Sequence, residues 1–215
     1  MKNVIVISPH PDDEVLGAGG TLLKHKEKND NIFWVIVTCM PEMQERKNEI
    51  ECVKKELGIK KVYELNHPTA SLNSDSLITL ISQFSGIFNE CKPEVLYLPN
   101  RSDIHSDHRV VFDAAISCTK SFRYPFIEKI LMYECISETE FAPALPENIF
   151  LPNYLVDISN YLDKKLDIIK IYKSEIAEHP FPRSLKNIEG LAVFRGAIAG
   201  VEYAEAFQLV KYIDK

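Results

Sequence analysis

Two short segments hold most of the side chains that could do chemistry. Residues 8–14 read SPHPDDE and residues 103–108 read DIHSDH. Imidazoles and carboxylates are the usual ligands of a catalytic zinc site, which takes three protein ligands and keeps one position for water. The metal lowers the pKa of that water toward ~7, and a nearby carboxylate can accept the remaining proton as a general base. The two segments therefore predict metal-dependent hydrolysis if the fold brings them together.

The first segment is stiff and carries adjacent carboxylates. Pro11 fixes its own φ and biases His10 toward an extended conformation, so the loop can hold ligand directions at low entropic cost. The side chains of Asp12 and Asp13 diverge, so that one can bind a metal while the other faces the bound water. An alternative is that one of them only caps the following helix, with Glu14 favoured by the helix dipole. That alternative leaves the histidine and the prolines unexplained, so we favour a functional site.

The second segment lies at the start of a predicted helix. We expect Ser106 to cap this helix, which places His105 on the loop and His108 in the first turn. The two imidazoles can then converge on one site without both binding a metal. An alternative is a polar helix start in which Ser106 and Asp107 act only as caps, but two histidines and two aspartates in six residues favour a functional site.

Apolar runs that alternate with helical stretches predict the frame around these segments. Continuous apolar strands suit a sheet that is buried on both faces, which is usually parallel. We therefore expect an α/β fold, with a single domain over residues 1–215 and a mostly parallel sheet flanked by helices. Both segments follow predicted strands, and sites gather at the carboxyl ends of such strands. The predicted strands are Val4–Ile7, Ile32–Cys39, Val62–Leu65, Val95–Leu98, Ile130–Tyr133 and Tyr154–Ile158. The predicted helices are Leu16–Lys28, Pro41–Leu57, Ser74–Glu90, Ser106–Thr119, Ser159–Glu175 and Arg183–Arg195.

Composition narrows the class of function. The net charge is -6, so the chain lacks the basic footprint of a nucleic-acid partner, and we expect none. No run of about 20 apolar residues is present, which predicts no membrane span. The five cysteines are scattered and form no CxxC pair, as expected for reduced, mostly buried thiols of a cytoplasmic protein. The Gly17-x-Gly19-Gly20 pattern lacks nucleotide-binding spacing, and we interpret it as close packing of a helix on the sheet.

The chain resembles the PIG-L/LmbE-like family of zinc-dependent N-acetylglucosaminyl deacetylases. The resemblance rests first on Pro-His-Pro-Asp-Asp-Glu at residues 9–14 and His-Ser-Asp-His at residues 105–108. It implies a single Rossmann-like domain without a nucleotide role. The similarity extends over nearly the whole chain, through Arg46-x-x-Glu49, Leu57-Gly58, Arg195-Gly196, Gly200 and Tyr203-Ala204-Glu205-Ala206-Phe207.

The resemblance also implies a role for the motif residues. By it, His10, Asp13 and His108 bind Zn²⁺, although another divalent ion such as Fe²⁺ would suit the same ligands. Asp12 is then the general base, and His105 stabilises the oxyanion of the transition state.

Three further residues receive roles from the same resemblance. Asp107 would orient His105 and favour its protonated form. Arg46 matches a substrate-binding arginine of the family, although a helix-surface ion pair with Glu49 is an ordinary alternative. Asp103 stands two residues before His105, where thiol-biosynthesis members can carry an aromatic residue, and we assign it to substrate binding as well.

The implied activity is removal of an N-acetyl group from a small glucosamine-containing molecule. A sugar conjugate, a bacillithiol-type precursor and a polysaccharide precursor all fit, and a homo-oligomer is compatible with the sequence. Two alternatives stay open, which are a hydrolase of another amide or ester and a non-catalytic sugar-binding module on the same fold. Asp12 and His105 argue against the binding module, because binding alone needs neither a base nor an oxyanion donor.

Overall fold

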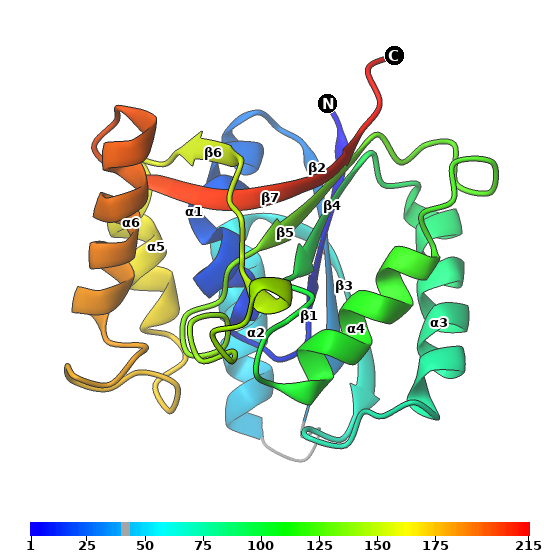
Figure 1. The fold of residues 1–215 in the computed structure, drawn as a ribbon, viewed down its shortest axis with the longest axis horizontal. Coiled ribbons are helices and arrows are strands. Elements are labelled where there is room, and N and C mark those ends of the chain that lie inside the picture. The colour runs from blue at the N-terminus through cyan, green and yellow to red at the C-terminus, as the bar shows by residue number, and fades with distance from the viewer. Residues whose placement is uncertain (40–43) are drawn as a thin grey trace.

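The computed structural model describes residues 1–39 and 44–215. It contains a seven-stranded sheet in the order β3-β2-β1-β4-β5-β7-β6, with helices packed on both faces (Figure 1). The expected α/β class is confirmed. The strands are β1 (Asn3–Ser8), β2 (Asn31–Thr38), β3 (Ile59–His67), β4 (Val95–Pro99), β5 (Lys129–Tyr133), β6 (Tyr154–Asp157) and β7 (Ala204–Tyr212). The helices are α1 (Asp13–Glu27), α2 (Gln44–Leu57), α3 (Ser76–Cys91), α4 (Ser106–Ser117), α5 (Leu162–Ile169) and α6 (Leu185–Ala199), with a 3₁₀ turn at Pro146–Asn148.

The sheet is mostly parallel, as predicted, with an antiparallel edge. Strands β3, β2, β1, β4 and β5 run parallel to their neighbours, whereas β7 pairs antiparallel with both β5 and β6. Strand β7 was not among the predicted strands. Its first half is buried but contains Glu205, and such a charge makes a run look unlike a buried strand. The structure pairs this carboxylate with the Lys165 ammonium at 2.7 Å, which satisfies the buried charge.

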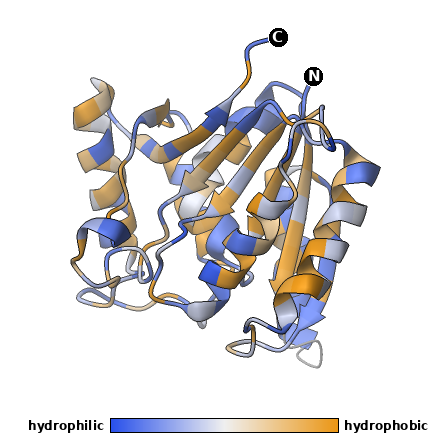
Figure 2. Cartoon of the chain, turned by 45° about the vertical axis from the view of Figure 1, so that its right-hand side comes forward, coloured by the Kyte–Doolittle hydropathy of each residue, from blue (hydrophilic) through white to orange (hydrophobic). Residues whose placement is uncertain are grey.

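The core occupies both faces of the sheet. Alternate residues of β1 point to opposite sides, so that Val4 and Val6 join one buried cluster and Ile5 and Ile7 join the other. The first cluster includes residues of α1, α2 and α5, and the second includes residues of α3 and α4. Figure 2 shows the sheet as a hydrophobic layer between helices that carry hydrophilic residues.

Close contact between α1 and the sheet explains the glycine pattern. A Cβ atom at Gly17 would lie 2.2 Å from the Tyr133 ring, and one at Gly20 would lie 2.7 Å from the Ile158 side chain. The interpretation as helix–sheet packing is therefore confirmed. This packing fixes the position of Asp13, the first residue of α1.

Some helix boundaries differ from the predicted ones. The predicted start of α2 at Pro41 lies outside the described residues. Its predicted end at Leu57 is confirmed, and Gly58 follows it with a φ of +68°. Helix α5 ends at Ile169, before the predicted Glu175, because the following segment turns back so that the buried Tyr172 hydroxyl reaches Glu14 at 2.7 Å. Within the described part of the chain, no helix has the length and apolarity needed to cross a membrane.

Candidate active site

Both polar segments open at the same edge of the sheet. Strand β1 pairs with β2 on one side and with β4 on the other, so the connections diverge at the boundary between β1 and β4. Ligands of open α/β sheets bind at such a switch point, outside the carboxyl ends of the strands. His10 follows β1, and His105 and His108 follow β4.

His10, Asp13 and His108 form one cluster. Their candidate ligand atoms all lie within 4.8 Å of one another. The Asp13 Oδ2 atom is 3.4 Å from His10 Nδ1 and 3.3 Å from His108 Nε2. Two nitrogens that bind the same zinc ion lie at most about 4.2 Å apart, so a small side-chain movement suffices for all three groups to reach one ion.

The His108 side chain fits the role of a metal ligand. It is fully buried, and its Nδ1 atom lies 2.8 Å from the Asp103 carboxylate. Since a carboxylate accepts, Nδ1 carries the hydrogen, which leaves the lone pair on Nε2. That Nε2 atom is buried without a hydrogen-bond partner among the described residues, and it faces Asp13. A histidine held by a carboxylate through its other nitrogen is the usual arrangement around zinc.

The charges of the cluster hold one another in place. Burial favours the neutral form of Asp13, but the neighbouring imidazoles outweigh it and keep the pKa of Asp13 well below its usual value. Burial likewise disfavours protonated His108, yet Asp13 and Asp103 raise the pKa of His108 well above its usual value. Asp13 is therefore a charged carboxylate between two imidazoles, a set of groups that suits a divalent cation.

A second group of potential ligands shares His10 with the first. Atoms of His10, His105 and Asp107 also lie within 4.8 Å of one another. However, the Asp107 carboxylate accepts the backbone N–H groups of Ala70 and Leu72 at 2.8 and 3.1 Å, and His105 Nδ1 accepts the Asp107 backbone N–H at 3.1 Å. Because these lone pairs are occupied, the first cluster is the better metal site.

Asp12 lies beside the cluster on a strained backbone. Its φ is +135°, a conformation that residues other than glycine rarely adopt, and such strain concentrates at functional sites. It occupies the position that precedes α1, but its side chain makes no capping hydrogen bond, so the alternative of a simple helix cap fails. Burial and the charge of Asp13 raise the pKa of Asp12, whereas Arg183 lowers it. The carboxylate is thus a better proton acceptor than an ordinary aspartate.

The surroundings of His105 differ from the expected ones. His105, rather than Ser106, precedes α4 as its cap, because its Nδ1 accepts the Asp107 backbone N–H. The Asp107 carboxylate is 3.9 Å from His105 but 3.2 Å from His10. Burial and the charge of His10 lower the pKa of His105. The expected protonated imidazole therefore does not match this geometry, which holds a neutral ring with its hydrogen on Nε2.

The surroundings of Asp103 also differ from the expected ones. It is fully buried behind His108, and its second oxygen accepts hydrogen bonds from Thr139 Oγ1 and Asn100 Nδ2 at 2.7 and 3.0 Å. The prediction that Asp103 binds substrate finds no support in this geometry, because the side chain is closed off from the cavity. Its contacts favour a role in holding His108.

Comparison with known proteins gives the family. Residues 5–119, more than half of the chain, match the PIG-L family, described as GlcNAc-PI de-N-acetylase. The chain belongs to the PIG-L family. Diacetylchitobiose deacetylase from Thermococcus kodakarensis is 21% identical over 98% of this chain and 84% of its own length. Probable N-acetyl-alpha-D-glucosaminyl L-malate deacetylase 2 from Bacillus cereus is 22% identical over 81% of this chain and 84% of its own length.

Solved structures confirm the fold of this PIG-L protein. The conserved protein TT1542 from Thermus thermophilus has a TM-score of 0.80 at 23% identity and covers 100% of this chain and 97% of its own. GalB, the 4-carboxy-2-hydroxymuconate hydratase from Pseudomonas putida, has a TM-score of 0.75 at 19% identity and covers 100% of this chain and 98% of its own. Because proteins with this fold include a hydratase, the reaction must be argued from the site.

The site of the PIG-L chain opens into a cavity of about 360 Å³. Its wall includes Arg46, which forms ion pairs with Glu175 at 2.5 Å and with Glu49 at 3.2 Å. The predicted pair with Glu49 is thus confirmed, and Arg46 also faces the cavity. Arg183 contacts Glu175 at 3.2 Å and Asp12 at 3.5 Å.

Three charged residues of this wall lie outside the predicted site, namely Glu138, Glu175 and Arg183. They come from loops far from either motif in the sequence. Arg183 lies in the Pro-rich loop around His179, and its guanidinium alone suggests contact with a phosphate or carboxylate, with a solvated or structural role as an equal alternative. The two glutamates have no distinctive neighbours in the sequence.

Proposed function

We propose that this PIG-L protein is a metal-dependent N-deacetylase of a small glucosamine-containing molecule. The observation that carries the proposal is the cluster of His10, Asp13 and His108 beside two polar groups that are not needed as ligands, Asp12 and His105. A sugar-binding module would need only the cavity. The family match and the two deacetylase relatives support the same reaction.

Each side chain has a distinct task in this proposal. A divalent ion held by the cluster would polarise the amide carbonyl and make water more acidic. Asp12 accepts the proton of the attacking water and can return it to the leaving amine. His105 donates through Nε2–H to the oxygen on which negative charge develops. Asp107 fixes the His10 ring and, through its backbone N–H, the His105 ring.

The residues that line the cavity and the ligands of the cluster also suggest how the substrate and the ion are bound. We assign Arg46 to contact with the sugar, because it lines the cavity with Asp12 and His105. Two nitrogen ligands and one carboxylate suit Zn²⁺ and also Fe²⁺. A cytoplasmic location and a homo-oligomeric state remain predictions.

Acetate release from the purified protein tests the proposal. The protein is stripped with a chelator, reloaded with Zn²⁺ or Fe²⁺, and assayed with N-acetylglucosamine, N,N'-diacetylchitobiose and N-acetylglucosaminyl malate. We expect acetate only from the reloaded protein. Full activity after stripping would refute metal dependence, and no acetate from any of the sugars would refute the deacetylase. Turnover of simple amides or esters alone would instead support the other hydrolase.

A further inference from the structure

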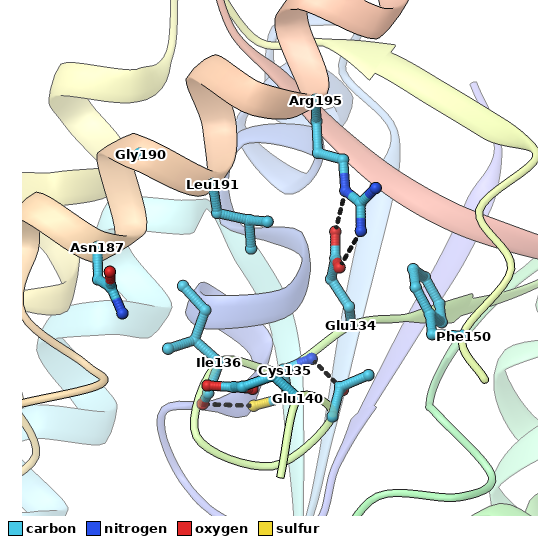
Figure 3. A pocket seen from close by; sticks show the side chains of 10 residues that line it. Glu134, Cys135, Ile136, Glu140, Phe150, Asn187, Gly190, Leu191 and Arg195 are labelled. Atoms are coloured by element: carbon cyan, nitrogen blue, oxygen red, sulfur yellow. Dashed lines mark hydrogen bonds and ion pairs between the residues drawn. The ribbon is translucent and has the colours of Figure 1, made fainter. Parts of the chain in front are cut away.

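A second cavity lies beside the catalytic one. Its volume is about 430 Å³, within the range of roughly 300–1,000 Å³ that is usual for small-molecule sites. Figure 3 shows it between α6, which carries Asn187 and Leu191, and the segment that carries Ile136 and Phe150. The roles argued above for the PIG-L chain use none of these residues.

The two cavities adjoin each other. Cys135 lines the second cavity, and its thiol lies 3.1 Å from the carboxylate of Asp13, which lines the catalytic one. The loop that follows contributes Glu138 to the catalytic cavity and Thr139 to the second. The second cavity is therefore the neighbouring space for the part of a substrate that lies beyond its acetamido group.

The lining of the second cavity suits a sugar ring. Ile136 and Leu191 lie on one side of this cavity and can cover the C–H face of a pyranose, and Phe150 lies on the other side (Figure 3). Near Phe150, Arg195 donates from Nε and Nη2 to both oxygens of Glu134, at 2.8 and 2.6 Å. Within the described part of the chain, Arg195 Nη1 makes no hydrogen bond that would compete with a ligand hydroxyl. An apolar wall with a few fixed polar groups is typical of a specific ligand pocket.

The charges favour a neutral ligand. Every arginine that lines either cavity is already paired, Arg46 and Arg183 with Glu175 and Arg195 with Glu134. Glu138 and Glu140 also line these walls, and within the described residues neither carboxylate forms an ion pair. A carboxylate in the second cavity would lie near Glu134 and Glu140, and like charges repel.

We propose that the second cavity binds a neutral sugar ring attached to the N-acetylglucosamine unit. The preferred substrates would then be neutral disaccharides or glycosides rather than acidic conjugates. The N-acetylglucosamine unit in this inference rests on the proposed deacetylase function. The neutral sugar attached to it rests on the second cavity alone.

Gly190 provides a sharp test. It lines the second cavity, and a Cβ atom there would meet no atom within 4 Å, so Gly190→Trp can fill the cavity without disturbing the core. Gly86→Trp is the matched control, because Gly86 lies on α3 and is equally unobstructed. Gly190→Ala tests the backbone change alone. Each variant is assayed for acetate release from N,N'-diacetylchitobiose, N-acetylglucosamine and N-acetylglucosaminyl malate.

We expect Gly190→Trp to lower kcat/KM for the disaccharide about tenfold or more, with little change for the monosaccharide. Gly86→Trp and Gly190→Ala should retain the preference of the unmodified protein for the disaccharide. An equal loss on both sugars, an unchanged disaccharide rate, or a preference of the unmodified protein for the malate conjugate would overturn the proposal.

A binding measurement keeps this test independent of turnover. Saturation-transfer NMR with N,N'-diacetylchitobiose and the chelator-treated protein should show contact with both sugar rings. With Gly190→Trp, the contact of the second ring should be lost. If both rings bind but the metal-loaded protein releases no acetate, the deacetylase proposal fails and the second sugar site stands. If the second ring shows no contact, or the same contact in Gly190→Trp, the second site fails whatever the activity.

Discussion

Asp12 and Asp13 are neighbours in the chain but face different surroundings. Burial would raise the pKa of Asp13, but the imidazoles of His10 and His108 on either side of it outweigh burial and lower that pKa. Burial and the negative charge of Asp13 raise the pKa of Asp12, and Arg183 offsets only part of this rise. When two neighbouring carboxyl groups have different pKa values because of their environments, commonly one transfers protons and the other stays ionised. The structure thus supports Asp13 as the ligand and Asp12 as the base.

Replacement of Asp12 should separate catalysis from metal binding. Asp12→Asn removes the proton acceptor but leaves the three ligands, so we expect full metal content and a kcat about 10²–10⁴ times lower. Metal analysis and acetate release measure the two quantities. Asp163→Asn, an exposed residue at the beginning of α5, is the control and should change neither. Loss of the ion in Asp12→Asn would instead show that Asp12 is a ligand.

Asp103 provides a test of the support given to His108. Asp103→Asn keeps the shape but removes the charge that polarises the imidazole, and we expect metal affinity to fall about 10–100-fold. Competition with a chelating dye measures this affinity. Asp113→Asn, an exposed change on α4, should leave it unaltered. A changed KM with unaltered metal affinity would return Asp103 to the role of a substrate-binding residue.

Among the elements, α1 sets the geometry of the first motif. The helix begins at Asp13 and packs its glycines directly on the Tyr133 and Ile158 side chains. The Tyr133 hydroxyl donates to the Ile7 carbonyl at 2.9 Å, next to the loop that carries His10. Any displacement of α1 therefore moves Asp13, a proposed metal ligand, relative to the end of β4.

Gly17→Ala should reveal this dependence. The added methyl group would lie 2.2 Å from the Tyr133 ring, so helix or ring must shift. We expect a loss of roughly 1–3 kcal/mol in the free energy of unfolding, measured by urea denaturation, together with weaker metal binding. Gly190→Ala meets no neighbours and should instead stabilise by about 0.5–1 kcal/mol, because alanine favours a helix. Equal unfolding midpoints for the two variants would show that the contact at Gly17 relaxes freely.

The sequence predicted local features and missed those that depend on distant contacts. Apolar runs such as those in β1 and β2 identify buried strands because the signal lies within the run itself. Strand β7 escaped because Glu205 interrupts its pattern, and only the distant Lys165 explains that charge. The motif residues were recognisable from their spacing. Glu175 and Arg183 were not, since their pairing exists only once the loops are folded against α1 and α2.

At the scale of the whole molecule, the site joins segments that are far apart in the chain. The cluster combines the loop after β1 with the beginning of α4, and Arg183 reaches it from the loop before α6. Four buried aspartates meet at this edge of the sheet, and buried charges of one sign are costly unless compensated. They are Asp12, Asp13, Asp103 and Asp107. A bound cation would offset part of this cost and tie the two halves of the parallel sheet together.

Metal binding should therefore stabilise the entire fold. A ligand that binds only the folded state at 100 times its dissociation constant contributes about 2.7 kcal/mol, which corresponds to a rise in Tm of roughly 5–10 °C for a chain of this size. We expect this rise when Zn²⁺ is added to the stripped protein, followed by differential scanning fluorimetry. Asp12→Asn should retain it, because the ligands are intact, and His108→Ala should lose it. His67→Ala controls for binding elsewhere, since His67 bonds Gln83 at 2.9 Å and belongs to neither group of potential ligands. The same rise in His108→Ala as in the unmodified protein would mean that the ion stabilises the fold from another site, and the assignment of the cluster would be wrong.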